Sequence, residues 1–159
     1  MNSNEAPHPS MVFPSDTSVV PMVAVGKNVD ATTIYPGYCV RLTFSATTTT
    51  SDGVDMTAEP TTDAKLRTLV LGFAQTKILP GATGIYSYAG RVEGAWVTIN
   101  GAANATGGDW ICFSSQLRGC AKVTGTAGNK MGFGLMDGRI VASGATKSRQ
   151  TVWQVPWRV

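Results

Sequence analysis

The single histidine of the chain, His8, is the first residue to test for catalysis, because histidine is the commonest general base. It lies between Pro7 and Pro9, in a proline-rich N-terminal stretch. A general base must be held within hydrogen-bonding distance of the proton that it removes. His8 is poorly placed for that. We therefore expect neither a Ser-His-Asp nor a Cys-His mechanism, and we predict that the protein is not an enzyme.

The three cysteines, Cys39, Cys112 and Cys120, lie far apart in the sequence and lack the spacing of a metal site. Their odd number argues against a complete disulfide framework. A free cysteine often packs as a small hydrophobic residue. We therefore expect buried free thiols, no metal and no cofactor. The sequence leaves open whether Cys112 and Cys120 approach each other.

Four acidic residues lie close together along the chain: Asp52, Asp55, Glu59 and Asp63. Their spacing does not match that of a calcium-binding loop, so a solvated loop is the favoured interpretation. A glycosidase built on two carboxylates stays open from the sequence, although the chain has only 10 acidic residues.

Residues 130–139, KMGFGLMDGR, contain closely spaced glycines that invite comparison with a phosphate-binding loop. Their G-x-G-x-x-x-G spacing is one residue too long for the dinucleotide fingerprint, and no helix start follows. Gly132 and Gly134 instead flank Phe133, as they would on one face of a strand. Residues 69–78, LVLGFAQTKI, repeat the Gly-Phe phrase. We interpret the two phrases as equivalent strands of an internal pseudo-repeat, with chance similarity as the alternative.

The composition favours strands over helices, with 20 Thr, 16 Val and 18 Gly but only 3 Glu. Residues 38–45 alternate apolar and polar side chains, which is the period of a strand. Further strands are predicted at 68–75, on both sides of a turn at Glu93-Gly94, at 109–114, at 120–124, and in a hairpin that turns at Asp137-Gly138. The predicted fold class is all-β: a compact antiparallel β-sandwich or small β-barrel. The core is expected to include Phe44, Leu71, Phe73, Trp110, Phe133 and Leu135.

The two ends of the chain differ in composition from its middle. We divide the chain into an extended, proline-rich N-terminal arm (1–30), a β-domain (31–146) and an apolar, aromatic C-terminal arm (147–159). Apolar and aromatic side chains in such arms are suited to contacts with a partner. The residues expected to make them are Met11, Val12, Phe13, Trp153, Val155 and Trp157. Packing of the two tryptophans over the chain's own core is the alternative.

The surface is expected to be poor in charge, because 14% of the residues are charged and 43% are hydrophobic. Such a surface tends to associate, so we expect a partner. The net charge of +3 comes without a run of basic residues, which argues against direct binding of nucleic acid. No apolar run approaches the ~18 residues of a membrane span, and no secretory signal pattern is seen. We expect a protein that is made in the cytoplasm and does not enter a membrane.

Four phrases in a fixed order carry a resemblance to a known family: YPGYCVRL (35–42), LVLGFAQTKILPGATGIYSYAGRVEGAWV (69–97), GGDWICFS (107–114) and KMGFGLMDGRIVASG (130–144). The series resembles the small capsid-decoration (cement) proteins of tailed bacteriophages. The resemblance implies a non-enzymatic virion protein on the exterior of the capsid. It would bind the major capsid protein, form a homotrimer and stabilise the head by clamping neighbouring capsid subunits.

Two other functions stay open from the sequence. One is a tail or head-fibre β-module that contacts a receptor or glycan, with Tyr86, Tyr88 and Trp96 stacking on sugars. The other is a small β-fold enzyme or a host binding module.

Overall fold

The computed structural model describes residues 21–44, 53–63, 71–98, 107–123, 134–137 and 147–154. The regular elements in these ranges are all strands, which confirms the all-β prediction. They are β1 (Met22–Asn28), β2 (Cys39–Phe44), β3 (Val54–Thr57), β4 (Leu71–Ala74), β5 (Thr83–Thr98), β6 (Trp110–Phe113), β7 (Ala121–Val123), β8 (Gly134–Met136) and β9 (Lys147–Gln154).

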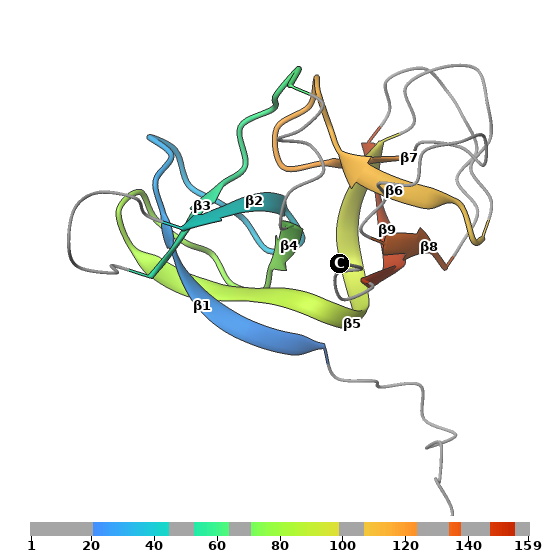
Figure 1. The fold of residues 1–159 in the computed structure, drawn as a ribbon, viewed down its shortest axis with the longest axis horizontal. Coiled ribbons are helices and arrows are strands. Elements are labelled where there is room, and N and C mark those ends of the chain that lie inside the picture. The colour runs from blue at the N-terminus through green and yellow to red at the C-terminus, as the bar shows by residue number, and fades with distance from the viewer. Residues whose placement is uncertain are drawn as a thin grey trace, which may run out of the picture.

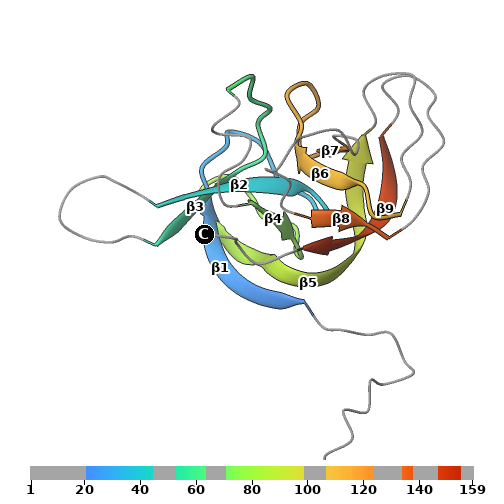
Figure 2. The ribbon, with the colours of Figure 1, turned by 45° about the vertical axis from the view of Figure 1, so that its right-hand side comes forward.

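These strands form two closed rings that share one long strand (Figure 1, Figure 2). In the first barrel, β1, β3, β2, β4 and β5 close through the pairing of β1 with β5. In the second barrel, β5, β7, β6, β8 and β9 close through the pairing of β5 with β9. Strand β5 belongs to both, because its residues 83–89 pair with β1 and its residues 90–98 pair with β9. Of the two predicted architectures, the structure has the barrel.

The two barrels have the same topology. The second half of β5 takes the place of β1, β6 that of β2, β7 that of β3, β8 that of β4, and β9 that of the first half of β5. The pairing directions agree as well. β1–β3 and β5–β7 are parallel, whereas the other pairs are antiparallel. The described part of the chain therefore consists of two structural repeats fused through β5. The prediction was an antiparallel architecture, but each repeat also contains one parallel pair of strands.

The repeats also correspond at the turns that lead into β2 and β6. The Gly37 N–H donates to the Ala74 carbonyl at 2.8 Å, and the Gly108 N–H donates to the Met136 carbonyl at 2.8 Å. In return, the Ala74 N–H donates to the Tyr38 carbonyl, and the Met136 N–H donates to the Asp109 carbonyl, both at 2.9 Å. Both glycines have a positive φ, 82° and 88°, which other residues rarely adopt. The two turns are therefore equivalent.

The two Gly-Phe phrases of the sequence fall at β4 and β8, which are equivalent strands. Gly72 of β4 pairs with Val40, and Gly134 of β8 pairs with Ile111. Val40 and Ile111 are the matching buried residues of β2 and β6. The predicted equivalence of the two strands is confirmed, but Gly134, and not Gly132, is the counterpart of Gly72.

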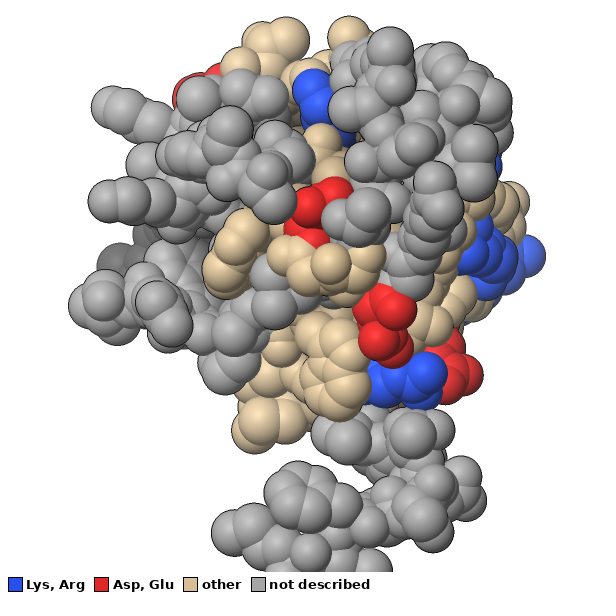
Figure 3. Space-filling model, turned by 90° about the vertical axis from the view of Figure 1, so that its right-hand side faces the viewer, with Lys and Arg blue, Asp and Glu red and all other residues tan. Residues whose placement is uncertain are grey.

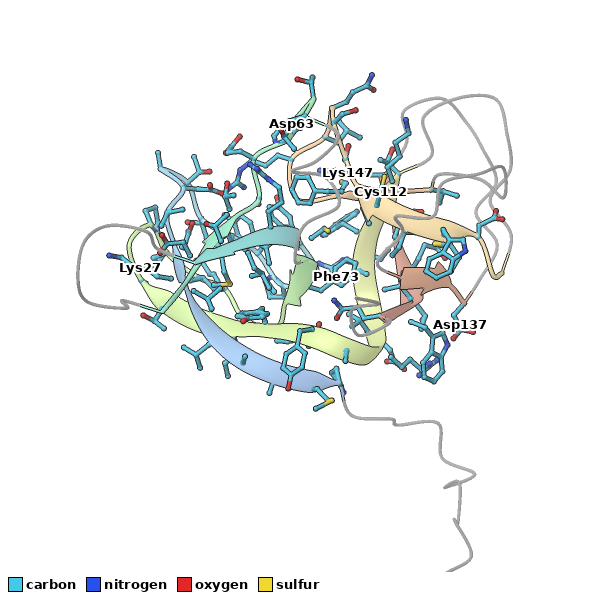
Figure 4. The ribbon with its side chains drawn as sticks, in the orientation of Figure 1. Lys27, Asp63, Phe73, Cys112, Asp137 and Lys147 are labelled. Carbon is cyan, nitrogen blue, oxygen red and sulfur yellow. The ribbon has the colours of Figure 1, made fainter. Side chains whose placement is uncertain are left out.

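Each barrel has an apolar core of its own. The core of the first barrel consists of Ile34, Val40, Leu42, Met56, Ala58, Ala74, Ile78 and Tyr86. The core of the second barrel consists of Val92, Ala95, Val97, Ile111, Phe113, Ala121, Val123, Met136 and Val152, together with Cys39 and Phe73 from the first barrel. Figure 4 shows Phe73 between the two barrels, so this side chain helps to hold them together.

The six predicted core residues have different outcomes. Phe73 is fully buried. Trp110 is only half-buried, because Ile111 and Phe113 take the inward positions of β6. Phe44, Leu71 and Leu135 lie in β2, β4 and β8, but their side chains are outside the described part, and Phe133 lies outside the described residues.

The predicted boundaries require three corrections. β1 and β9 are strands of the barrels, although both lie in segments assigned to the arms. β3 was predicted as part of a polar loop, since it is short and contains Asp55. At Glu93-Gly94 the chain does not turn back. β5 continues through it with a register shift between Val92 and Ala95, and Gly94 takes a φ of 69°.

Candidate interaction surfaces

Strand β1 has its apolar side chains on the outside. Val23 and Val25 are exposed, as is Val29 just after the strand, whereas Gly26 and Asn28 face inward and are buried. This arrangement is the reverse of an ordinary amphipathic strand. Because the inward positions of β1 are small or polar, the usual alternation of an amphipathic strand fails to mark it.

Local packing explains why Gly26 and Asn28 point inward. A Cβ on Gly26 would lie 2.8 Å from Cγ of Met56, a core side chain, so only glycine fits there. The Asn28 amide donates to the carbonyls of Ile78 at 3.1 Å and Thr32 at 3.0 Å. Its oxygen accepts from the backbone N–H of Asp30 at 2.9 Å. The buried amide is therefore satisfied, and the valines of β1 must face solvent.

The outward valines belong to a larger apolar patch, which we call the β1 surface. It comprises Met22, Val23, Val25, Val29 and Ile85. Val25 is 59% exposed, and its direct cross-strand neighbour Ile85 is 39% exposed. Lys27, labelled in Figure 4, is the one charged residue within β1. These exposed apolar side chains make the outer side of β1 a candidate contact surface.

The two predicted arms are attached at one place. Met22, the first residue of β1, pairs with Ala89, and Gln154, the last residue of β9, pairs with Gly90. Ala89 and Gly90 are neighbours in the middle of β5, where the two barrels meet. The residues that precede β1 and those that follow β9 therefore start from a common point on the barrels.

Trp153 is the one predicted contact residue that lies within the described ranges. In the register of the second barrel it lies between Leu135 of β8 and Arg91 of β5. Its side chain is 38% exposed, so a large part of the indole is open to a partner. The other predicted contact residues, Met11, Val12, Phe13, Val155 and Trp157, lie outside the described residues.

The aromatic residues considered for glycan stacking are mostly covered. Tyr86 is buried in the core of the first barrel, and Tyr88 packs against that core. The ring of Trp96 is covered by two cations: Lys147 Nζ lies 5.2 Å and Arg149 Cζ 4.8 Å from its centroid. These contacts are cation–π interactions that occupy the face a sugar would need. The described geometry therefore gives the glycan alternative no support at these positions.

An arginine that the sequence did not point to joins the two barrels. Arg118, in the loop between β6 and β7, donates to the carboxylates of Asp30 at 3.0 Å and Glu59 at 2.7 Å. It also donates to the Thr33 carbonyl at 3.1 Å, and its guanidinium lies 5.5 Å from the ring centroid of Tyr38. Burial lowers the pKa of Arg118, but its bonds to the two carboxylates outweigh this and the net shift is upward. The cation is thus stabilised in its charged form.

Asp30, the inner partner of Arg118, is itself fixed by the first barrel. Its carboxylate accepts hydrogen bonds from the Thr57 hydroxyl and from the backbone N–H of Ala58, the latter at 2.8 Å. Only 3% of the Asp30 side chain is exposed, so these donors and Arg118 take the place of water around the carboxylate.

Backbone contacts reinforce this joint. The Gly119 N–H donates to the Ala58 carbonyl at 2.9 Å, and the Cys39 N–H donates to the Gly119 carbonyl at 2.8 Å. A Cβ on Gly119 would lie 2.4 Å from Cδ2 of Tyr38, so the loop approaches as closely as glycine allows. The two barrels are therefore expected to behave as one rigid body.

The three cysteines are free and buried, as predicted. Burial raises the pKa of the Cys39 thiol well above its ordinary value, and the neighbouring Cys120 and Cys112 raise it further. Burial also raises the pKa of Cys120, although Lys147 partly opposes this. Among the described residues, no group of three His, Cys, Asp or Glu side chains is placed to hold a metal ion.

A charged cluster on the outside of the second barrel has a structural explanation. Arg91 donates to Asp137 at 3.3 Å and to Glu93, and basic and acidic side chains adjoin on this side of the molecule in Figure 3. Glu93 and Asp137 are open to solvent, so this is a solvated ion-pair network of low energetic value.

No protein-family model matches the chain, and a search of the curated proteins finds no significant match. None of the described segments forms a helix that is long and apolar enough to cross a membrane.

Proposed function

We propose that the protein is a structural virion protein that binds the outer surface of a tailed-bacteriophage capsid. There it clamps neighbouring subunits of the major capsid protein and stabilises the head. The observation that carries the proposal is the common origin of the two arms, since Met22 and Gln154 pair with adjacent residues of β5. The order of phrases in the sequence, which resembles that of decoration proteins, supports it.

The mechanism requires a rigid body with attached binding segments. The joint made by Arg118 and the close contact at Gly119 hold the two barrels in one arrangement. Because the arms adjoin the ends of β1 and β9 that pair with the middle of β5, a force on either arm acts on the junction between the barrels. The apolar residues of the arms (Met11, Val12, Phe13, Val155 and Trp157), together with Trp153 of β9, would then fill sites on adjacent capsid subunits.

Binding through several weak sites suits this function better than one strong site. A single exposed aromatic such as Trp153 contributes a few kcal/mol at most when buried, about 2–4 kcal/mol for a strong anchor. Linked sites raise the total affinity by about 10²–10⁴-fold without any new contact. We propose a homotrimer for the same reason, since three copies triple the number of sites.

Binding of purified protein to isolated heads that lack it tests the role of the arms. The full chain, a variant without residues 1–20 and a Trp153→Ser variant are compared by co-sedimentation with the heads. We expect the deletion to abolish binding and Trp153→Ser to weaken it about tenfold or more, with circular dichroism spectra unchanged. Tyr35→Ser, which removes an exposed aromatic of the first barrel, is the matched control and should bind normally. Normal decoration by the deletion variant would show that the arm is not the binding element.

A further inference from the structure

The first repeat begins with β1, and the second repeat begins with the second half of β5. These two strands differ in what covers them. Asn28 pairs with Met56, and its counterpart Val97 pairs with Ala121, both pairs being parallel. Counting back from Asn28 and Val97, Lys27 corresponds to Trp96. Val25 corresponds to the two residues Glu93 and Gly94, because β5 carries one extra residue at its register shift.

In the second barrel, this stretch of strand is covered by the first barrel. The Trp96 N–H donates to the Gly37 carbonyl at 2.9 Å. A Cβ on Gly37 would lie only 2.2 Å from the carbonyl oxygen of Gly94. The turn at Pro36-Gly37 therefore fits tightly against β5, and this face of the repeat is a contact between two barrels.

In the first barrel, the corresponding stretch is uncovered. Val25 and Lys27 are both exposed, and Val25 belongs to the apolar β1 surface. From Met22 to Gly26, β1 pairs with β5 along one edge, whereas its pairing with β3 involves only Lys27 and Asn28. Among the described residues, the face that binds a barrel in the second repeat has no barrel in the first.

The turn that would match it is also uncovered. Gly108, the counterpart of Gly37, is exposed, and a Cβ built on it meets no atom within 4 Å. Gly107 beside it is exposed too. Within the described part of the chain, the second barrel thus presents an uncovered turn and the first barrel an uncovered β1 surface.

We propose that copies of the chain bind head to tail. The Gly107-Gly108 turn of one copy covers the β1 surface of the next, as the Pro36-Gly37 turn covers β5 within the chain. The occupant is a second copy because the equivalent face already receives an equivalent turn of this same chain. With Lys27 as the one charge of β1, such a contact buries little unpaired charge. This contact is heterologous, so every chain uses both surfaces.

The strength of one such contact is modest. The five side chains of the β1 surface are already partly buried in the single chain, so covering them fully removes only part of their apolar area from water. This gain is small enough to be nearly offset by the cost of bringing two chains together. Self-association is therefore expected to depend on protein concentration. The proposal does not depend on what the assembled chains bind.

Site-specific cross-linking of the full chain tests the contact. Val25→Cys and Gly107→Cys proteins are mixed and treated with a short bismaleimide at about 100 μM. We expect a cross-linked dimer in the mixture at a level at least tenfold above that of either variant alone. The control mixture pairs Val25→Cys with Thr62→Cys, an exposed site that belongs to neither the β1 surface nor the Gly107-Gly108 turn. Yields equal to the control, or strong cross-linking of Val25→Cys with itself, would overturn the head-to-tail arrangement.

Light scattering across a concentration series gives a second readout that does not need cysteines. Wild-type protein should associate, and Val25→Glu should raise the dissociation constant at least tenfold. Thr151→Glu, on the second barrel, should not. A wild-type chain that stays monomeric at several hundred μM contradicts the proposal. If Val25→Glu weakens binding to heads but leaves self-association intact, the β1 surface faces the capsid, and the proposed function survives while this inference fails.

Discussion

Gly37 of the first barrel lies so close to Gly94 of the second that a Cβ on Gly37 would be 2.2 Å from the Gly94 carbonyl oxygen. Gly37 also has a φ of 82°. We expect Gly37→Ala to lower the free energy of unfolding by about 2–5 kcal/mol, because backbone strain and overpacking add to each other. Urea unfolding followed by circular dichroism measures this loss.

Gly81→Ala separates the two causes. Gly81 has a similar φ of 74°, but a Cβ there would meet no atom within 4 Å. Only backbone strain applies, and we expect a loss of about 1–2 kcal/mol. Equal losses for the two variants would mean that the tight contact between the barrels is absent in solution.

Arg118→Gln tests the joint between the barrels. The substitution removes the cation that faces the buried Asp30 carboxylate, and breaking a buried pair from one side costs about 3–5 kcal/mol. Because a quarter of the Arg118 side chain is exposed, solvent reduces this figure, and we expect a loss of about 1–3 kcal/mol. Arg91→Gln, which breaks the solvated network of the second barrel, is the control and should cost less. A larger loss for Arg91→Gln in urea unfolding would contradict the assignment of Arg118 as the joint.

The buried thiols predict a dependence of stability on pH. In the unfolded chain Cys39 ionises near its ordinary value of 9.0, whereas in the folded protein its pKa is raised by burial and by Cys120 and Cys112. The fold therefore favours the neutral thiol. Its contribution to stability is complete below about pH 9 and is lost as the pH rises from there toward the raised pKa of the folded protein.

Two measurements check this prediction. Unfolding free energies at pH 8 and pH 10 should differ less in a Cys39→Ala variant than in the wild type, because the other titrating groups are common to both. Alkylation by iodoacetamide at pH 8 should be slow in the native protein and fast in urea. Rapid alkylation of Cys39 in the native state would show that the thiol is accessible.

The predictable parts of the fold are those whose information is local. The alternation at 38–45 and the apolar run at Trp110 to Phe113 each identified a strand, and the repeated Gly-Phe phrase identified two equivalent strands. The phrase was matched two residues out of register, since Gly134 corresponds to Gly72. Short phrases do not fix register, which depends on pairing partners elsewhere in the chain.

The parts that could not be predicted depend on distant residues. In β1, Gly26 faces inward because Met56 leaves no room for a side chain there. Asn28 faces inward because its amide bonds to the carbonyls of Thr32 and Ile78. No local pattern reveals either contact. Arg118 binds Asp30 across 88 positions of sequence and belongs to no motif. The common origin of the arms likewise appears only when β1 and β9 both pair with β5.

The central claim is that this chain decorates a phage head, and saturation binding of the full-length protein to isolated heads tests it most directly. Heads that lack the protein are titrated with it, sedimented and analysed for bound chain. The account predicts saturable binding at a fixed ratio to the major capsid protein, together with heads that resist heat or chelation better than undecorated ones. Protein that stays in the supernatant at every concentration, with head stability unchanged, would contradict it.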